Sequence, residues 1–503
     1  MRRGDVKIKM GETKRPQIAS QGRAGYGQNM SIQAVMDAEF GNASARALGA
    51  KFDAFVDDFL PKCSKFDIAN FLRIAGKKSR NNMSLHMIRR LPDIACKLDS
   101  MASSRWNYKE IAFIMYGLQS CKESDDGYLT IMSTMSKTMT RTALRDEAIP
   151  GQDLSMILYG LRRNKFKQRE SREMLSCLHR IAITCQEPLD AQAVGNALYG
   201  LQGMSSDDAE VRSLVRALSG QVERCREPLN AQTVGNALYG LQGMSSDNAE
   251  VRSLVRALSG QVERCREPLN AQAVGNALYG LVGVVGIDEG RDLGLHLMRT
   301  YLGLHRNGAV VSSDCVYLGQ SVVMVLPLLK DHLSEKEVEE CERIISDIEI
   351  KSHALDEYGD SIINVSFQSR SEQHMHSATM KALAVSKLRV SHNEHLFGLF
   401  ECDIVVRVPR AIDACIAEGG RGGGRYPKGE REEQSLVINI EVDGVHHRRE
   451  KKKRFCKMRD EYLVSRGVVI ERMEISTLRA MSEQEVEEWV LDITAKAMLS
   501  RHT

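Results

Sequence analysis

The chain has 503 residues, more than one compact core usually holds, so several domains or a repeat array are expected. Hydrophobic residues make up 43% of the chain, which excludes global disorder, and a net charge of +3 excludes a histone-like polycation. The longest apolar run, Ser321 to Leu329, is too short to span a bilayer, so membrane insertion is not expected.

Residues 1–45 are expected to form a basic N-terminal extension. The first thirty residues carry seven Lys or Arg and two acids, and no apolar segment follows, so a secretory signal is not predicted. Two interpretations remain open for this extension, an organelle-targeting segment and a disordered basic tail.

Residues 46–330 are interpreted as a helical-repeat array with clear units at 187–226, 227–266 and 267–306. The first two units differ at three positions only, and the third diverges after Leu281. A Tyr-Gly-Leu core recurs at spacings of 43, 40, 40 and 40 residues, which predicts stacked supersecondary units. Its tyrosines are Tyr116, Tyr159, Tyr199, Tyr239 and Tyr279. Degenerate units are expected at Ile68–Gly76 and Asp314–Leu329.

Each unit reads as two helices. Asp190 is the expected N-cap of the first helix, which runs to about Gly203, and Ser206 or Asp207 is the expected cap of the second. Apolar residues recur with a helical period in both, at Val194, Ala197, Leu198 and Leu201, then at Val211, Leu214, Val215, Leu218 and Val222. Neither stripe is buried by one unit alone, so neighbouring units must stack into an α-solenoid.

A polar face lies opposite the apolar stripe of each first helix. It consists of two amides and a tyrosine per unit: Gln192, Asn196 and Tyr199; Gln232, Asn236 and Tyr239; Gln272, Asn276 and Tyr279. Such a set suits hydrogen bonding to base edges and base stacking, as in proteins that bind one base per unit. In the alternative interpretation, the asparagine bonds the backbone of a neighbouring unit and the tyrosine closes the joint between units.

Residues 331–365 are expected to connect the array to a second domain. Ser334–Ile348 reads as a charged amphipathic helix, and residues 349–365 read as a linker. From residue 366 to 503 the pattern changes to a helix at Ser371–Leu388, a strand around Asp403, a strand ending at Glu441–Gly444, a basic helix, a third strand and a final helix near Ser482–Leu499. This order predicts a small α/β domain.

Three carboxylates are expected to converge at the strand ends of this domain. Asp403 lies on the first strand, and Glu441 and Asp443 form an E-x-D pair on the next. Hard oxygen ligands suit Mg²⁺, which activates water for phosphodiester cleavage, and His447 is a candidate general base. Acids at strand ends also commonly cap the following segment, and Asp443 stands where a nuclease of this type places a lysine. The basic run expected to hold phosphates is Arg448, Arg449, Lys451, Lys452, Lys453, Arg454 and Lys457, or else this run is a solvated face.

The stretch from Ile438 to Ile475 resembles a RAP domain, whose hallmark E-x-D-G-x-x-H maps onto Glu441, Asp443, Gly444 and His447. It is equally similar to very-short-patch-repair endonucleases, whose R-D-x-x-L helix matches Arg459, Asp460 and Leu463. The resemblance implies the PD-(D/E)xK architecture. Helical repeats before a RAP domain are typical of organellar RNA-binding proteins such as octotricopeptide-repeat and FAST-kinase-type proteins, although the octotricopeptide P-P-P-E-W pattern is absent.

The expected fold is therefore mostly α, an N-terminal α-solenoid followed by a small PD-(D/E)xK-like α/β domain. The favoured function is binding of single-stranded RNA in a mitochondrion or chloroplast, or otherwise in the cytoplasm, to support RNA processing, stability or translation. Other organellar RNA-processing proteins are candidate partners. The alternatives are a Mg²⁺-dependent nuclease, in which Asp403, Glu441 and Asp443 bind the metal, and a protein–protein scaffold. Without nuclease activity no cofactor is expected.

Overall fold

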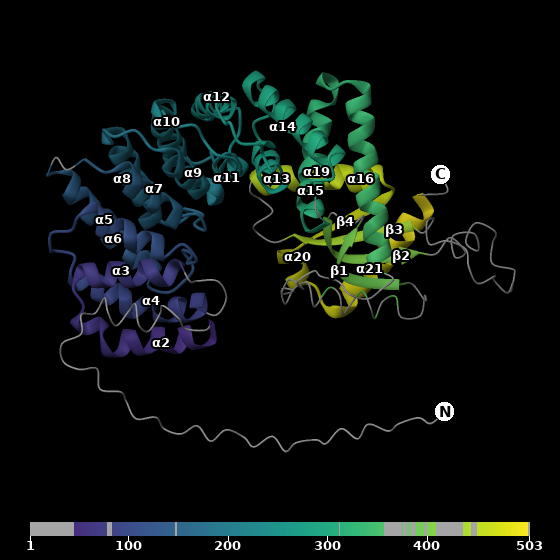
Figure 1. Ribbon diagram of the computed structural model, residues 1–503. Helices are drawn as coiled ribbons and strands as arrows, with labels where there is room; N and C mark the ends of the chain where they lie inside the picture. The colour runs from purple at the N-terminus through teal and green to yellow at the C-terminus, as the bar shows by residue number, and fades with distance from the viewer. Residues whose placement is uncertain are drawn as a thin grey trace, which may run out of the picture.

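The computed structural model describes residues 45–77, 83–145, 148–310, 312–356, 389–396, 400–408, 436–443 and 450–500, together with Met375, Thr379, Lys381 and Leu383. Its helices and strands form a two-layered helical array followed by a small sheet covered by helices (Figure 1). Within the described residues, no helix is long and apolar enough to cross a membrane.

The array consists of an inner and an outer layer, and each unit contributes one helix to each. In Figure 1 the layers curve into an arc, with α8, α10 and α12 on the outer side and α9, α11 and α13 on the side toward the sheet. The inner layer stacks α3 (Lys65–Lys77), α5 (Tyr108–Gly117), α7 (Gly151–Gly160), α9 (Ala191–Tyr199), α11 (Ala231–Tyr239), α13 (Ala271–Leu281) and α15 (Ser312–Leu329). The outer layer stacks α2 (Ala45–Asp58), α4 (Met83–Ser100), α6 (Tyr128–Ala143), α8 (Arg169–Thr184), α10 (Ala209–Arg224), α12 (Ala249–Glu263), α14 (Asp288–Arg306) and α16 (Glu335–Asp356).

Short 3₁₀ turns follow several of these helices: η1 (Leu60–Lys62), η2 (Gly200–Gly203), η3 (Gly240–Gly243) and η4 (Lys330–His332). The first helix of the 187–226 unit is therefore α-helical only to Tyr199, and the turn to Gly203 is tighter. The Asp190 cap is confirmed, because its carboxylate accepts the Ala193 amide at 2.6 Å. The predicted cap of the second helix is wrong: Asp208 holds the N-cap position, and its side chain makes no capping hydrogen bond.

Both predicted apolar stripes are buried, and they join one core that runs along the array. Polar side chains repeat across the joints between units. The amide of Gln261 donates to the carbonyls of Val222 and Cys225 at 2.8 and 3.2 Å, and Gln221 makes the same pair of bonds one unit earlier. Because each unit supplies the partners of the next, the array is held by contacts between immediate neighbours.

The connecting helix α16 is longer than predicted. It continues to Asp356, so residues 349–356 are helical rather than part of a linker, and residues 357–365 lie outside the described ranges. Its start is a capping box, in which Ser334 and Glu337 bond each other's backbone amides at 2.9 and 3.3 Å.

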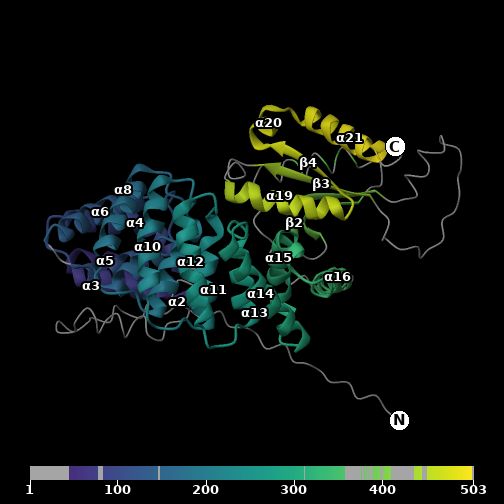
Figure 2. The same cartoon turned by 90° about the horizontal axis from the view of Figure 1, so that it is seen from above.

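The α/β part is a four-stranded sheet in the order β1-β2-β3-β4. Its strands are β1 (Arg389–Leu396), β2 (Phe400–Val408), β3 (Leu436–Asp443) and β4 (Val468–Glu474). The first three strands are antiparallel neighbours, and β4 runs parallel to β3 after a crossover through α19 (Glu450–Ser465). One face carries α19, and the other carries α20 (Ile475–Ala480) and α21 (Glu483–Ser500), as Figure 2 shows.

The sequence pattern missed two elements here. Among the described strands, β1 pairs with β2 alone, and its polar Ser-His-Asn-Glu-His stretch lacks the apolar signature of a buried strand. Helix α20 is a short turn between β4 and α21. The predicted helix at 371–388 is described only at Met375, Thr379 and Lys381, which are helical, and at Leu383.

Helix α19 also joins the two parts of the molecule. It contacts α15 and η3 of the array, and Tyr462 and Arg466 near its C-terminal end line a groove with Leu326 and Ile345. Apolar residues of the sheet, including Phe400 and Val405, therefore belong to the same core as the array.

Candidate functional site

The predicted polar face forms one continuous surface on the inner layer. Gln192, Asn196 and Tyr199 are spaced i, i+4, i+7, which places them on one side of α9. Gln192 is exposed, and Asn196 and Tyr199 are half-buried. The same exposures recur in α11 and α13, because the helices stack in register.

The tyrosines form a ladder. The ring centroids of Tyr116 and Tyr159 are 5.4 Å apart, and the next three steps measure 5.6, 5.7 and 5.7 Å, with interplanar angles of 21–24°. The rings of Tyr159, Tyr199 and Tyr239 therefore lie against other rings on both faces. This arrangement supports the alternative interpretation for the tyrosines, which close the joints between units. The faces of these three rings are therefore covered by neighbouring tyrosines and are closed to base stacking.

The last ring of the ladder, Tyr279, is half-buried. Burial raises the pKa of Tyr279 to about 12, and the neighbouring Tyr239 adds to the shift. The phenol is therefore neutral at physiological pH.

The amides of the inner face are the groups that the fold does not use. Within the described ranges, no hydrogen-bond partner exists for the side chains of Gln192, Asn196, Gln232, Asn236, Gln272 and Asn276. Other polar residues of the same units are satisfied by neighbouring units, as for Gln221 and Gln261. Among the residues that the structure describes, the Asn196 side chain has no hydrogen bond to the backbone of a neighbouring unit, so these contacts give no support to the alternative interpretation for the asparagines.

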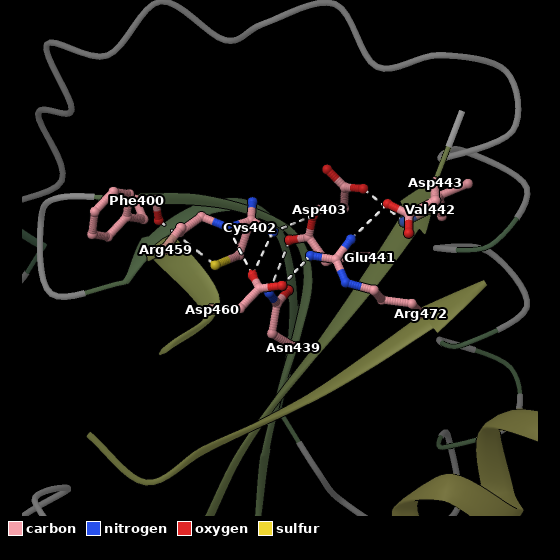
Figure 3. Close-up of polar contacts among 10 residues, drawn as sticks. All are labelled: Phe400, Cys402, Asp403, Asn439, Glu441, Val442, Asp443, Arg459, Asp460 and Arg472. Atoms are coloured by element: carbon pink, nitrogen blue, oxygen red, sulfur yellow. Dashed lines mark hydrogen bonds and ion pairs between the residues drawn. The ribbon is translucent and has the colours of Figure 1, made fainter. Parts of the chain in front are cut away.

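A second group of polar side chains lies between the sheet and α19 (Figure 3). Asn439, Glu441 and Asp443 alternate along β3, so all three face one side of the sheet. Ile438, Ile440 and Val442 point to the other side and pack in the core beneath α21. The E-x-D spacing therefore aims both acids at α19.

Glu441 is bound by an arginine of α19. The carboxylate is 1% exposed, its Oε2 lies 2.9 Å from Nη2 of Arg459, and its Oε1 accepts the Asn439 amide at 2.8 Å. Burial disfavours the charge of Arg459, but the carboxylates of Glu441 and Asp460 outweigh burial and raise its pKa above the ordinary value. The result is a buried ion pair that ties α19 to the sheet.

Asp443 is bound by an arginine of the sheet. Nη1 of Arg472, on β4, lies 2.6 Å from Oδ1 of Asp443, and Nη2 binds Oδ2 of Asp460 at 2.5 Å. Burial opposes the charge of Arg472, yet the two carboxylates raise its pKa. The predicted R-D-x-x-L motif of α19 thus has a structural role, because Arg459 and Asp460 bind the sheet and Leu463 is buried in the core.

The carboxylate of Asp403 continues the contact between β2 and β3 beyond the point where their backbone pairing ends. The β2–β3 pairing runs from Val408–Leu436 to Ile404–Ile440. Just beyond this last pair, the amide of Val442 donates to Oδ2 of Asp403 at 2.8 Å. Asp403 lies within β2, so this contact joins two neighbouring strands and is not the capping of a following segment that the sequence left open as an alternative.

The structure brings the three predicted carboxylates together on the two central strands of the sheet, β2 and β3, where each has a protein partner. Among the residues that the structure describes, no group of three or more His, Cys, Asp or Glu is disposed to hold a metal ion. Asn439 has a buried Oδ1 without a hydrogen-bond partner within the same residues, and it points among these carboxylates. The predicted Mg²⁺ site stays a prediction, and binding would require metal to displace Arg459 or Arg472.

The predicted phosphate-binding run is only partly described. His447, Arg448 and Arg449 lie outside the described ranges. Lys451, Lys452, Lys453 and Arg454 fall in the first turns of α19, and only their backbone is described. Lys457 is exposed, and its Nζ lies 3.8 Å from Glu461.

Four polar residues of the cluster were not predicted as site residues: Asn439, Arg459, Asp460 and Arg472. The sequence pattern could have identified Asn439, because this residue precedes the E-x-D pair by two positions and therefore lies on the same face of β3. Arg472 was not, because its position depends on the register that sets Glu441 opposite Arg472.

No protein-family model matches this chain, and a comparison with curated proteins also gives no match.

Proposed function

We propose that this protein binds single-stranded RNA along the inner face of its repeat array. The observation that carries the proposal is the row of amides that recurs in α9, α11 and α13 without intramolecular partners among the described residues. Amides recognise base edges with both donors and acceptors, and a helical array presents them at a constant pitch. The tyrosine hydroxyls add uncharged polar groups to the same surface.

The resemblance to RAP-domain proteins supports the binding of transcripts inside an organelle. On this proposal the protein acts in a mitochondrion or chloroplast, where it supports RNA processing, stability or translation. Helix α19 contacts η3, so the basic first turns of α19 belong to a segment that lies along the array. Phosphates of an RNA on the inner face would meet this segment.

The test is the combined change Asn196→Ala, Asn236→Ala and Asn276→Ala in the full chain. At about 1 kcal/mol per lost hydrogen bond, three contacts predict an affinity for a selected RNA lowered by roughly a hundredfold. Ser213→Ala with Ser253→Ala, on the outer layer, is the matched control and should leave the dissociation constant unchanged. Unaltered RNA binding in the Asn variant, with an unchanged helical spectrum, would remove this face from the interface.

Selection from a random RNA pool tests the register. The three units carry the same Gln, Asn and Tyr, so one base per unit predicts a run of like nucleotides. In α7, Gln152 keeps the glutamine, but Met156 stands where the later units have asparagine. The base preference should therefore change at this unit. Crosslinking that recovers a protein partner and no RNA would favour the scaffold interpretation instead.

We further propose that the α/β domain is a weak or inactive nuclease. Cleavage requires charge neutralisation at the phosphate, whereas Arg459 and Arg472 are engaged with Glu441 and Asp443. The full chain is therefore expected to leave labelled RNA and DNA intact in Mg²⁺ or Mn²⁺ as in EDTA. Metal-dependent cleavage that is lost in Asp403→Ala and Glu441→Ala proteins of unchanged fold would establish the nuclease.

A further inference from the structure

We propose that a basic groove on the outer layer is a second RNA site, which binds phosphate groups without regard to sequence. The proposal rests on the RNA-binding function above for the identity of its ligand. The groove has a volume of about 840 Å³ and lies between α6 and α8. Its basic side chains are Lys137, Arg141, Lys167, Arg169, Arg172 and Arg180.

The lining of the groove restricts what binds there. Two carboxylates, Glu173 and Glu210, stand against the six cations, and the other lining residues are serines and a threonine. No apolar side chain lines the groove, so a peptide that docks through hydrophobic anchors has no pocket to fill. Six cations and three hydroxyl groups against two carboxylates leave an excess of positive charge, which suits an anion that carries many phosphates.

The cations are spread along the solvent side of α8. Arg169 and Arg180 are eleven residues apart, which at 1.5 Å per residue is about 16 Å along the helix. That length exceeds one phosphate group and suits consecutive nucleotides of a flexible strand. The groove contains no aromatic ring for base stacking, so the contacts are to the backbone and carry no sequence preference.

Four of the six cations also have partners within the fold: Arg141 bonds the Ala102 carbonyl, Arg169 pairs with Glu173, Arg180 bonds Thr140, and Arg172 bonds two carbonyls. Arg172 bonds the Phe166 and Lys167 carbonyls, and its equivalents Arg212 and Arg252 make the same type of bond in later units, so this position is structural. By contrast, the ammonium groups of Lys137 and Lys167 have no bonded partner within the described residues, and both side chains are exposed.

Comparison with the next unit shows that the charge is specific to this groove. Helices α8 and α10 begin forty residues apart, so Lys167, Arg169 and Arg180 correspond to Asp207, Ala209 and Gly220. The unit after that also has neutral or acidic residues at these three positions: Asp247, Ala249 and Gly260. The later units therefore form the same two helices without a cation at these three positions.

The loss-of-function test combines Lys137→Gln, Lys167→Gln and Arg180→Gln in the full chain. Each lost phosphate contact on a single strand flattens the slope of log affinity against log salt by about 0.7, so three should flatten it by about 2. The effect should be equal for any RNA sequence. The matched control, Arg226→Gln with Arg266→Gln and Lys336→Gln, removes three exposed charges outside the groove and should leave the slope unchanged.

The gain-of-function test places a lysine at Gly220 of α10, the position equivalent to Arg180 of α8. A Cβ at Gly220 meets no atom within 4 Å, and α10 packs against α8, so Gly220→Lys adds a cation at the position equivalent to Arg180 on the neighbouring helix. This variant should bind RNA more tightly and with a steeper salt slope, whereas Gly220→Ala, which improves the helix equally, should not.

The outcomes separate this inference from the function on which it rests. If the Asn variant weakens RNA binding and the groove variant behaves as its control does, the groove proposal is wrong and the inner-face proposal stands. If the wild-type chain binds no RNA, both fail. In that case, calorimetric titration with pyrophosphate that is lost in the groove variant would identify a small phosphate compound, rather than RNA, as the ligand.

Discussion

Glycine in the Tyr-Gly-Leu core is required because the inner helices approach each other closely at this residue. A Cβ built at Gly240 would lie 1.9 Å from the carbonyl oxygen of Leu198, and the equivalent positions Gly200 and Gly280 show the same clash. The glycine thus sets the distance between neighbouring units, which in turn sets the spacing of the tyrosine ladder.

Gly240→Ala is therefore expected to destabilise the array. The clash is with backbone, so helices must shift, at a cost of about 1–3 kcal/mol that exceeds the gain in helix propensity. Gly260→Ala is the matched control, since nothing lies within 4 Å of its Cβ, and it should stabilise the protein by about 0.5–1 kcal/mol. Denaturant unfolding of both variants measures the difference, and equal shifts would contradict the packing argument.

The three acids of the α/β domain have carboxylates in common but bind different kinds of partner. The sequence places Asp403, Glu441 and Asp443 as a set, whereas their partners are a backbone amide, a buried arginine of α19 and an arginine of β4. Removing one member of a buried ion pair leaves an uncompensated charge, so these residues contribute to the docking of α19 as well as to any chemistry.

At the scale of elements, the outer helices are linked by a series of arginine–glutamate pairs. Arg216 of α10 binds Glu250 of α12 at 2.5 Å, and Arg256 of α12 binds Glu289 of α14 at 2.8 Å. A hydrogen bond from its own backbone amide lowers the pKa of Glu250, and the Arg216 contact lowers it further. The same two causes lower the pKa of Glu289, with Arg256 as the arginine.

The stabilisation from these pairs should be lost in acid. A carboxylate with a lowered folded pKa stabilises the fold above its unfolded pKa of 4.5 and ceases to do so as the pH falls through the folded value. Glu250→Gln with Glu289→Gln should therefore lower the thermal midpoint at pH 7 and have little effect near pH 3. Glu223→Gln, at an exposed glutamate without an ion-pair partner in the described part of the chain, is the control; a pH-independent difference in the double variant would exclude this electrostatic origin.

At the scale of the whole molecule, two units of the array are nearly identical, so one of them can be deleted without creating new contacts between helices. Deleting residues 227–266 joins Arg226 to Glu267, which is the junction that Arg266 and Glu267 already form. The neighbours of every remaining helix keep almost the same sequence, and η2 takes the place of η3 beside α19.

This deletion is expected to give a folded protein with a lower thermal midpoint, because stability in such arrays is close to a sum over units and their interfaces. Its selected RNA should be one nucleotide shorter on the inner face. Circular dichroism and RNA selection measure these outcomes. Deleting half a unit, residues 227–246, should unfold the array instead, and a folded half-unit deletion would contradict the nearest-neighbour description.

The sequence by itself determined the repeat period, the two helices of each unit, the Asp190 cap and three of the four strands. These features follow from local spacing, because one period of apolar residues decides which face of a helix or strand is buried. The same spacing identified Gln192, Asn196 and their equivalents as a polar surface.

Only the tertiary structure decided what these side chains contact. The tyrosines stack on one another because glycine brings the inner helices close, a distance that no single unit encodes. Arg472 meets Asp443 through the β3–β4 register, Arg459 meets Glu441 through the packing of α19, and the groove between α6 and α8 combines two units. Each of these contacts joins segments that are far apart in the sequence, so it depends on how the elements pack and not on the local pattern of either segment.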